Sequence, residues 1–240
     1  MTDTATAALE GVTTLMFDFY GTVVDMQGSL TEAIAPYLQG KGYPGAPGQV
    51  VTWWRRTHFE NSMIDALLHR EHTPYREIGR QAVDYTLTRA GVPHTMDEVV
   101  ALVAEIGRLR PFPDVVDALT RLKEHGYALV VLSNGDPDLL ARGVPFSGTE
   151  KLFDRVISVA EAGSFKPHAV TYRTAAELIG ARPEQVLFVA NHAFDCVGAK
   201  AAGMRSAFVD RRRRPFGNDQ YPPDVVVGDF RELAEVATHG

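Results

Sequence analysis

The second half of the chain alternates between short apolar runs and helical stretches, and this alternation restricts the fold more than any other feature. Five apolar runs are typical of buried strands, at 127–132, 155–159, 186–189, 205–209 and 224–227. Helical patterns precede or separate them, at 114–125, 168–179 and 195–202. Strands that alternate with helices form parallel sheets with crossover connections. The sequence therefore predicts an α/β fold.

An earlier apolar run, Leu15 to Phe17, ends at Asp18 and leads into a Gly-Thr turn at 21–22. We interpret the run as a buried strand that stops at a tight loop. Open α/β sheets bind ligands outside the carboxyl ends of their strands. A carboxylate at this place can act as a nucleophile or hold a metal. Tyr20 occupies a position where phosphoryl transfer would require an acid.

The segment from about Met26 to Arg110 has a helical pattern without strand-like alternation. A helical insertion at this point would form a lid over the carboxyl end of the first strand. We therefore expect a core domain of residues 1–25 and 111–240 and a helical cap domain of residues 26–110. The short linkers near Met26 and at 110–113 could act as hinges.

Charge and composition exclude several classes of partner. The formal net charge is −6, which does not favour nucleic acid or an anionic membrane. The basic run at 211–214 is interpreted as a solvated loop rather than a binding patch. Cys196 is the only cysteine, so a reducing compartment fits. Residues 1–11 lack the features of a secretory signal, and no stretch is long and apolar enough to span a membrane. We expect a cytoplasmic protein.

Four polar segments stand at predicted strand ends or in the loops beyond them. They are Asp18 with Thr22, Ser133 with Asn134, Lys166 with Pro167, and the segment from Asn191 to Asp195. Each alone is more typical of a turn or of the surface than of a site. Four of them in this order, at successive strand ends, indicate one functional site.

This set resembles the haloacid dehalogenase superfamily from about Thr13 to Val236. In that superfamily an Asp after the first strand is the nucleophile, a Ser or Thr follows the second motif strand, a Lys forms the third motif, and acidic residues form the fourth. The resemblance implies a Rossmann-like parallel sheet core with an inserted helical cap. Most members are magnesium-dependent phosphatases.

Two departures from the phosphatase pattern favour another reaction. Phosphatases carry a second Asp two residues after the nucleophile, which protonates the leaving alcohol, whereas Tyr20 is a poor acid for that purpose. Their fourth motif usually reads Gly-Asp, and here Ala190-Asn191 replaces it. A hard divalent cation prefers anionic oxygen ligands, so Asn191 weakens such a site. A halide leaving group needs neither a proton nor a metal.

The sequence is closer to the (S)-2-haloacid dehalogenase branch, also called type II. The similar segments are 18–22, 132–135, 188–195 and Trp54-Arg55 with Glu60 further on. The resemblance implies metal-independent hydrolysis of short 2-haloalkanoic acids to 2-hydroxy acids and halide, with inversion, and no cofactor. The alternatives are a magnesium-dependent small-molecule phosphatase and a degenerate member that binds a small acid or a protein partner. Dimerisation is common in the family, so a homodimer is expected as well.

The resemblance also implies roles for the core residues. Asp18 would attack C2 and form an ester, Thr22 would orient its carboxylate, and Lys166 would balance the charge of two anions. Ser133 and nearby backbone N–H groups would bind the substrate carboxylate.

The halide site and the water site are implied in the same way. Arg55 would receive the halide with Asn134 and the ring of Phe194, although the adjacent Arg56 could replace it. Tyr20 and Phe59 would wall the pocket.

For hydrolysis of the ester, Asp195 is the candidate base, and Asn191 or His192 could position the water. Histidine side chains are common general bases, so His192 could also share the base role or merely pack beside Asp195. In the dehalogenase branch, Ala190 often corresponds to Ser and His192 to Asn.

Overall fold

The core of the protein is a six-stranded sheet in which every strand pair is parallel. In the computed structural model, residues 8–68 and 71–238 are described. The strand order is β3-β2-β1-β4-β5-β6. The strands are β1 (Thr14–Phe17), β2 (Ala128–Ser133), β3 (Arg155–Ser158), β4 (Val186–Ala190), β5 (Arg205–Val209) and β6 (Val225–Val227). The predicted Rossmann-like sheet is confirmed, and its order reverses at the central β1, where such sheets bind ligands.

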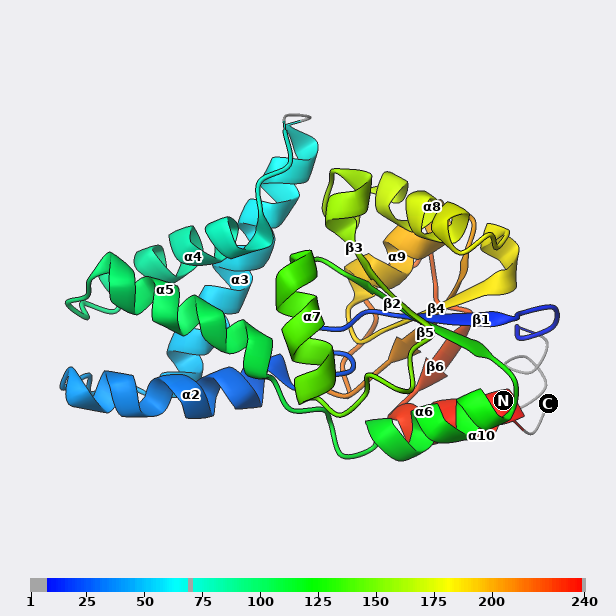
Figure 1. Ribbon diagram of the computed structural model, residues 1–240, viewed down its shortest axis with the longest axis horizontal. Helices are drawn as coiled ribbons and strands as arrows, with labels where there is room; N and C mark the ends of the chain where they lie inside the picture. The colour runs from blue at the N-terminus through cyan, green and yellow to red at the C-terminus, as the bar shows by residue number, and fades with distance from the viewer. Residues whose placement is uncertain (1–7, 69–70, 239–240) are drawn as a thin grey trace.

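Helices cover both faces of this sheet. The pair α6 (Val115–Glu124) and α10 (Phe230–Thr238) lies on one face, and α8 (Ala169–Leu178) with α9 (Ala193–Ala201) on the other (Figure 1). The helix α7 (Pro137–Phe146) packs beside β3. Neither α7 nor α10 was predicted. Pro145 and Gly143 inside α7 hide its helical pattern, because both residues are poor helix formers. Short 3-10 turns, η1 (Glu105–Arg108), η2 (Val159–Ala162) and η3 (Pro183–Gln185), complete the chain.

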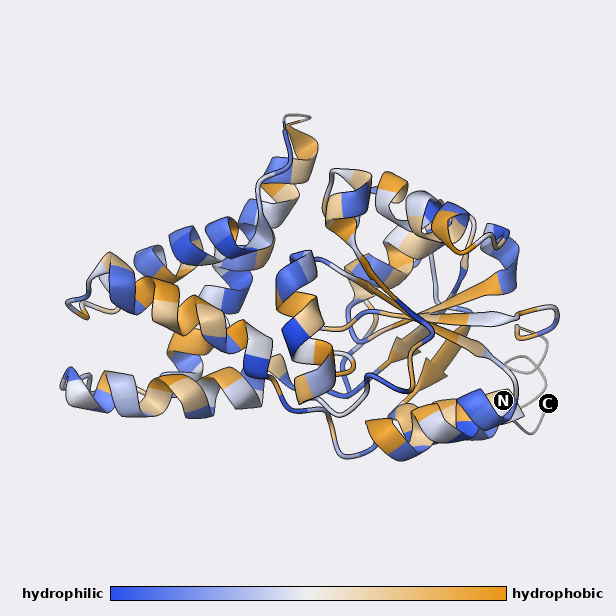
Figure 2. Ribbon diagram, viewed as in Figure 1, coloured by the Kyte–Doolittle hydropathy of each residue, from blue (hydrophilic) through white to orange (hydrophobic). Residues whose placement is uncertain are grey.

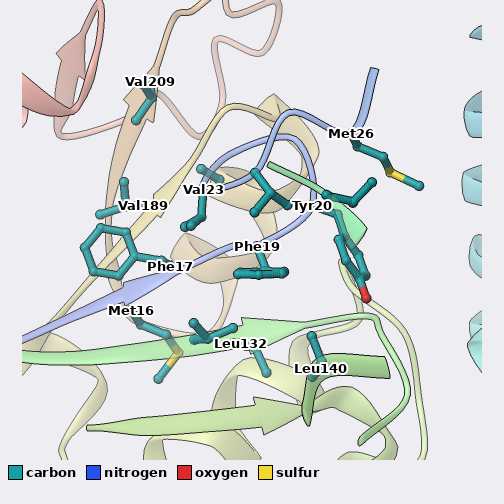
Figure 3. Close-up of a cluster of buried hydrophobic side chains, with 14 of the residues drawn as sticks. Met16, Phe17, Phe19, Tyr20, Val23, Met26, Leu132, Leu140, Val189 and Val209 are labelled. Carbon is teal, nitrogen blue, oxygen red and sulfur yellow. The ribbon is translucent and has the colours of Figure 1, made fainter. Parts of the chain in front are cut away.

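The central strands are buried on both faces, which explains why they are continuous apolar runs. Figure 2 shows apolar residues along the strands and mixed apolar and polar residues along the helices. The ring of Phe17 stacks on Phe230 with centroids 5.5 Å apart. In Figure 3, Phe17, Phe19 and Tyr20 follow the chain out of β1. This packing fixes the position of the residue between the two phenylalanines, Asp18.

The predicted helical insertion follows the first strand. It consists of α2 (Met26–Gly40), α3 (Pro47–Leu67), α4 (Tyr75–Arg89) and α5 (Met96–Ala104). These helices pack on one another and lie to the left of the sheet in Figure 1. None of the helices within the described ranges is both long and apolar enough to cross a membrane.

Two features join the insertion to the sheet. The entering and leaving segments lie side by side, since the Asp25 amide donates to Arg110 O at 2.8 Å and the Phe112 amide to Val23 O at 3.1 Å. In addition, the buried Asp136 carboxylate accepts hydrogen bonds from the amides of Tyr75 and Arg76, at 2.8 and 2.9 Å, and from Arg76 Nε at 3.0 Å. We call this second contact the Asp136 clamp. It ties the first turn of α4 to the loop that follows β2.

Candidate active site

The carboxylate of Asp18 lies directly after β1 and is held through both oxygens. Oδ1 accepts a hydrogen bond from Lys166 Nζ at 2.8 Å, and Oδ2 accepts one from Thr22 Oγ1 at 2.7 Å. His192 Nδ1 lies 3.3 Å from Oδ2. Burial alone would raise the pKa of Asp18, but the Lys166 charge and the contacts with His192 outweigh it and lower the pKa well below its usual value. Asp18 is therefore ionised at neutral pH.

Lys166 is fully buried and uses all three of its protons. Its Nζ donates to Asp18 Oδ1 and Asp195 Oδ2, both at 2.8 Å, and to Leu132 O at 3.0 Å. Burial lowers the pKa of Lys166, but the two carboxylates more than offset it, so the pKa is raised. The ammonium group is thus fixed between two acids at the carboxyl edge of the sheet.

Asp195 belongs to the first turn of α9 and is almost completely buried. Its Oδ2 accepts from Lys166, and its Oδ1 accepts from the hydroxyl of Tyr172. Burial and the nearby Asp18 charge raise the pKa of Asp195 against the opposing effect of Lys166. Sequence reasoning missed Tyr172, which lies in α8 without a motif of its own. With both oxygens bonded, Asp195 fixes the position of Lys166.

The loop after β4 reaches the nucleophile through Thr22. The Asn191 amide donates to Thr22 Oγ1 at 2.9 Å, and Asn191 Nδ2 donates to Gly21 O at 3.0 Å. Gly21 has a φ of +90°, and a Cβ there would lie 3.0 Å from His192 Cε1 and 3.2 Å from Arg55 Nη2. Glycine is therefore required where the nucleophile loop, His192 and Arg55 meet.

A cavity of about 600 Å³ opens beside these groups, between the sheet edge and the helical insertion. Ten of the predicted site residues line it: Asp18, Tyr20, Arg55, Phe59, Asn134, Lys166, Asn191, His192, Phe194 and Asp195. Ser133 and Thr22 are fully buried and are not among the lining residues. Sequence reasoning did not find Gln27 and Tyr75, which also line the cavity.

The two neighbouring arginines of α3 have different surroundings. The Nη1 of Arg55 donates to Gln27 Oε1 at 3.0 Å, while its Nε is buried without a hydrogen-bond partner in the described part of the chain. Burial and the charge of Arg212 lower the pKa of Arg55. Arg56 is exposed, and its Nε pairs with Glu60 at 2.7 Å. Of the two, Arg55 therefore offers a partly buried, incompletely bonded guanidinium to an anion.

Aromatic rings form part of the cavity wall. The rings of Phe59 and Phe194 lie 4.2 Å apart, and His192 lies 5.3 Å from Phe194. Tyr20 stacks on Tyr75 at 5.7 Å, and its hydroxyl is buried without a hydrogen-bond partner among the described residues. Burial raises the pKa of Tyr20 far above its ordinary value, so it stays neutral.

A family model for haloacid dehalogenase-like hydrolases matches residues 12–203. The chain belongs to this family. It is 31% identical over 219 residues to haloacetate dehalogenase H-2 of Moraxella sp. (strain B), and the match covers 91% of this chain and 95% of the relative. It is 35% identical over 197 residues to (S)-2-haloacid dehalogenase of Xanthobacter autotrophicus, and that match covers 82% of this chain and 74% of the relative.

The fold match agrees with these relatives. The solved structure of L-2-haloacid dehalogenase from Xanthobacter autotrophicus with chloropropionic acid covalently bound superposes with a TM-score of 0.82 at 29% identity. The match covers 94% of this chain and 98% of that one. The resemblance to (S)-2-haloacid dehalogenases that the motifs indicated is therefore confirmed.

In this haloacid dehalogenase-like hydrolase, the second motif is arranged behind the cavity surface. The Oγ of Ser133 accepts from the Gly135 amide at 3.2 Å. The Oδ1 of Asn134 accepts from the Lys166 amide at 3.0 Å, which connects the second motif to the third. Asn134 lines the cavity, so an anion in the cavity would meet Asn134 before Ser133.

In the basic run 211–214, the interpretation as a solvated loop is wrong for Arg211, whereas residues 212–214 are exposed. Its guanidinium donates to Asp114 at 2.9 and 3.0 Å and to Thr22 O at 3.1 Å, and it stacks on Phe112 at 4.0 Å. These partners are far apart in sequence, so the run itself gave no signal for them. Arg212 and Arg214 line the cavity.

The carboxylates of this family member do not fit a divalent cation. Lys166 occupies one oxygen of Asp18 and one of Asp195, and Tyr172 occupies the other Asp195 oxygen. Within residues 8–68 and 71–238, no three His, Cys, Asp or Glu side chains gather into a possible metal site. A divalent ion prefers anionic oxygen ligands, and Asn191 supplies an amide where the phosphatases have a carboxylate.

Proposed function

We propose that this hydrolase cleaves the carbon–halogen bond of short 2-haloalkanoic acids through an ester of Asp18 and releases 2-hydroxy acids with inverted configuration. One observation carries the proposal. An ionised carboxylate, fixed by Lys166 and Thr22, faces a cavity that Arg55 also lines. Nucleophile and halide acceptor are thus present in one site. The matches to haloacid dehalogenases support the same class of reaction.

In the first step, one oxygen of Asp18 donates an electron pair to C2 of the substrate, and the carbon–halogen bond breaks with its electron pair on the halide. The attack comes from the side opposite the halogen, so the carbon inverts. No proton is needed. Arg55, with Asn134 and the ring of Phe194, stabilises the departing anion, because preorganised positive charge favours a transition state in which negative charge develops.

The substrate carboxylate must approach a second carboxylate during this step. Two anions in a low-dielectric cavity repel each other strongly. Lys166 offsets this repulsion at Asp18, and we propose that backbone N–H groups of the second motif hold the substrate carboxylate. Ser133 would contribute by fixing the amide of Gly135, its observed partner.

In the second step, water attacks the carbonyl carbon of the Asp18 ester. A base takes one proton, and the departing alkoxide recovers a proton and leaves as the 2-hydroxy acid, which restores the Asp18 carboxylate. We propose His192 as the base, because it lines the cavity and reaches Asp18, whereas both oxygens of Asp195 are bonded. Asn191 would position the water, and Asp195 would hold Lys166 beside the ester oxygen.

The phosphatase alternative has less support. A phosphatase would need a proton donor for the leaving alcohol, and Tyr20 is a buried phenol with a raised pKa. It would also need a fourth-motif carboxylate for the divalent cation, and Asn191 supplies an amide in that place.

A single turnover in ¹⁸O-labelled water tests the ester route. With enzyme in excess over 2-chloropropionate and a chelator present, we expect chloride release, unlabelled lactate, and ¹⁸O in the Asp18 side chain. The label enters Asp18 because water attacks the ester carbonyl, not C2. Peptide mass spectrometry locates the label. Label found directly in lactate would rule out the ester, and phosphate release that depends on magnesium, without halide release, would favour the phosphatase.

Replacing His192 by glutamine should separate the two steps. We expect ester formation to continue while hydrolysis slows by about 10²- to 10⁴-fold, the usual contribution of a positioned base. Intact-protein mass spectrometry would then show the enzyme with a propionate adduct that the wild type does not accumulate. His168→Gln is the control, because His168 lies at the start of α8 and is not among the cavity-lining residues. Unchanged turnover in His192→Gln would return the base role to Asp195.

We also propose that the chain divides into a core of residues 1–25 and 111–240 and a cap of residues 26–110. The paired crossing of the chain near Asp25 and Arg110 supports these boundaries. Residues 1–7, 69–70 and 239–240 lie outside the described residues. The cytoplasmic location, the homodimer, and the exclusion of nucleic-acid and membrane partners stay predictions.

A further inference from the structure

The cavity is larger than a short haloacid requires. Its volume is about 600 Å³. Protein pockets of about 300–1,000 Å³ enclose ligands the size of a drug molecule. A three-carbon haloacid bound against Asp18 therefore leaves much of the space beyond C3 unfilled. The residues around that remaining space are what a longer substrate would meet.

The charges that line the cavity are unevenly distributed. Next to Asp18, the cation Lys166 is committed to two carboxylates. Among the other lining cations, Arg56 pairs with Glu60 and Arg211 with Asp114. Three guanidinium groups then have no ion-pair partner in the described part of the chain, those of Arg55, Arg212 and Arg214.

Arg212 lines the same cavity as Arg55. Burial lowers the pKa of Arg55 and the charge of Arg212 lowers it further, while the charges of Asp25 and Asp18 act in the opposite direction. Asp25 is the remaining carboxylate that lines the cavity, and its Oδ1 already accepts from the Gly28 amide. If Arg55 receives the halide, Arg212 and Arg214 face the cavity with no anion from a monocarboxylic substrate.

The loop that carries Arg212 and Arg214 has a fixed base. The Arg211 side chain is 9% exposed and is bonded to Asp114 and to Thr22 O. At its other end, the Arg214 amide donates to Asp210 Oδ1 at 2.9 Å. Arg212, Arg213 and Arg214 are all exposed, and of these three Arg212 and Arg214 line the cavity. The fixed backbone on both sides therefore presents these two guanidinium groups at the solvent-facing side of the cavity.

We infer that the cavity accepts 2-haloacids with a second carboxylate at the far end of the chain, and that Arg212 and Arg214 bind this second carboxylate. The inference rests on the proposed function. Guanidinium groups bind carboxylates through paired, charge-assisted hydrogen bonds, which are stronger than neutral ones. The preferred substrates are thus halogenated dicarboxylic acids, of the chain length that spans Asp18 and Arg212.

Matched substrate pairs test this specificity. The dicarboxylates 2-chlorosuccinate, 2-chloroglutarate and 2-chloroadipate are compared with 2-chlorobutanoate, 2-chloropentanoate and 2-chlorohexanoate by chloride release. For at least one chain length, we expect a kcat/KM about tenfold higher for the dicarboxylate, the size of effect that a charge-assisted contact gives. Arg212→Gln and Arg214→Gln should each reduce this preference by roughly fivefold while kcat/KM for the monocarboxylate changes by less than about twofold. Arg213→Gln, with the same change in net charge, should leave the preference unaltered.

Two results would overturn the inference. One is a wild-type enzyme that prefers the monocarboxylate at every length. The other is an equal loss for both substrate classes in all three variants, which is the signature of general electrostatic steering. Calorimetric binding of glutarate against pentanoate provides a readout without turnover. Glutarate binding that depends on Arg212, with no dehalogenation of any substrate, would reject the proposed function but keep the dicarboxylate site. Dehalogenation without a dicarboxylate preference would keep the proposed function but reject the dicarboxylate site.

Discussion

Replacing Asp18 by asparagine should lower kcat for halide release by at least about a thousandfold, because a carboxamide cannot form the ester and removal of a nucleophile typically has an effect of this size. The change is nearly isosteric, and Thr22 can still donate to the side-chain oxygen. Chloride release from 2-chloropropionate measures the loss. The covalent adduct should be absent from intact-protein mass spectra.

A matched control is available within the same cavity. Asp25 also lines the cavity, and its Oδ1 accepts the Gly28 amide at the start of α2. Asp25→Asn retains this acceptor, so we expect activity within a few-fold of wild type, since an amide oxygen also caps helices well. Retention of more than a tenth of the activity in Asp18→Asn, or an equal loss in Asp25→Asn, would contradict the assignment of the nucleophile.

Replacing Lys166 by methionine should have the second large effect, and it combines stability with activity. The change leaves Asp18 and Asp195 buried beside each other without a counter-ion, which we expect to lower the free energy of unfolding by about 3–5 kcal/mol at pH 8. Dehalogenation should be lost as well, because the pKa of Asp18 rises and the substrate anion meets uncompensated charge. Urea denaturation at several pH values measures the first effect.

The pH dependence of this loss has a definite sign. In the wild type, the lowered pKa of Asp18 means that its contribution to stability is present above its unfolded pKa and is lost only as pH falls through the lower folded pKa. Because the pKa of Lys166 is raised, its contribution to the free energy of unfolding is fully present below its unfolded pKa of 10.5. This contribution is lost only as pH rises through the higher folded pKa. Without Lys166, burial raises the pKa of Asp18. Protonation of Asp18 as pH falls then removes the uncompensated buried charge and reduces the destabilisation of the variant. The stability gap should therefore be larger at pH 8 than at pH 5.

A surface lysine serves as the comparison. Lys123 pairs with the exposed Asp154 at 2.8 Å. Lys123→Met should cost no more than about 1 kcal/mol, as is usual for exposed ion pairs. A loss in Lys166→Met that is equally small, or that grows as pH falls, would contradict the buried charge arrangement.

The sequence predicts the groups nearest the chemistry because they follow strand ends. Once the strands are parallel and ordered around β1, residues such as Asp18 and Asn134 must meet at one edge. Arg55 and Arg56 could not be separated in this way, since the rotation of α3 depends on packing against the core. Arg211 was misread because its partner Asp114 is distant in sequence and the loop conformation that joins them has no local signal.

The Asp136 clamp connects the loop that follows the second motif to the first turn of α4. Asp136 stands two residues after Asn134, and its carboxylate bonds the first amides of α4. If α4 moves away from the sheet, either its hydrogen bonds to Asp136 break or the loop after β2 moves with it. By reciprocity, an anion seated on that loop must favour the inward position of α4 as strongly as the inward position favours the anion. Entry of the substrate and closure of the cavity over it would then both depend on the hydrogen bonds of Asp136.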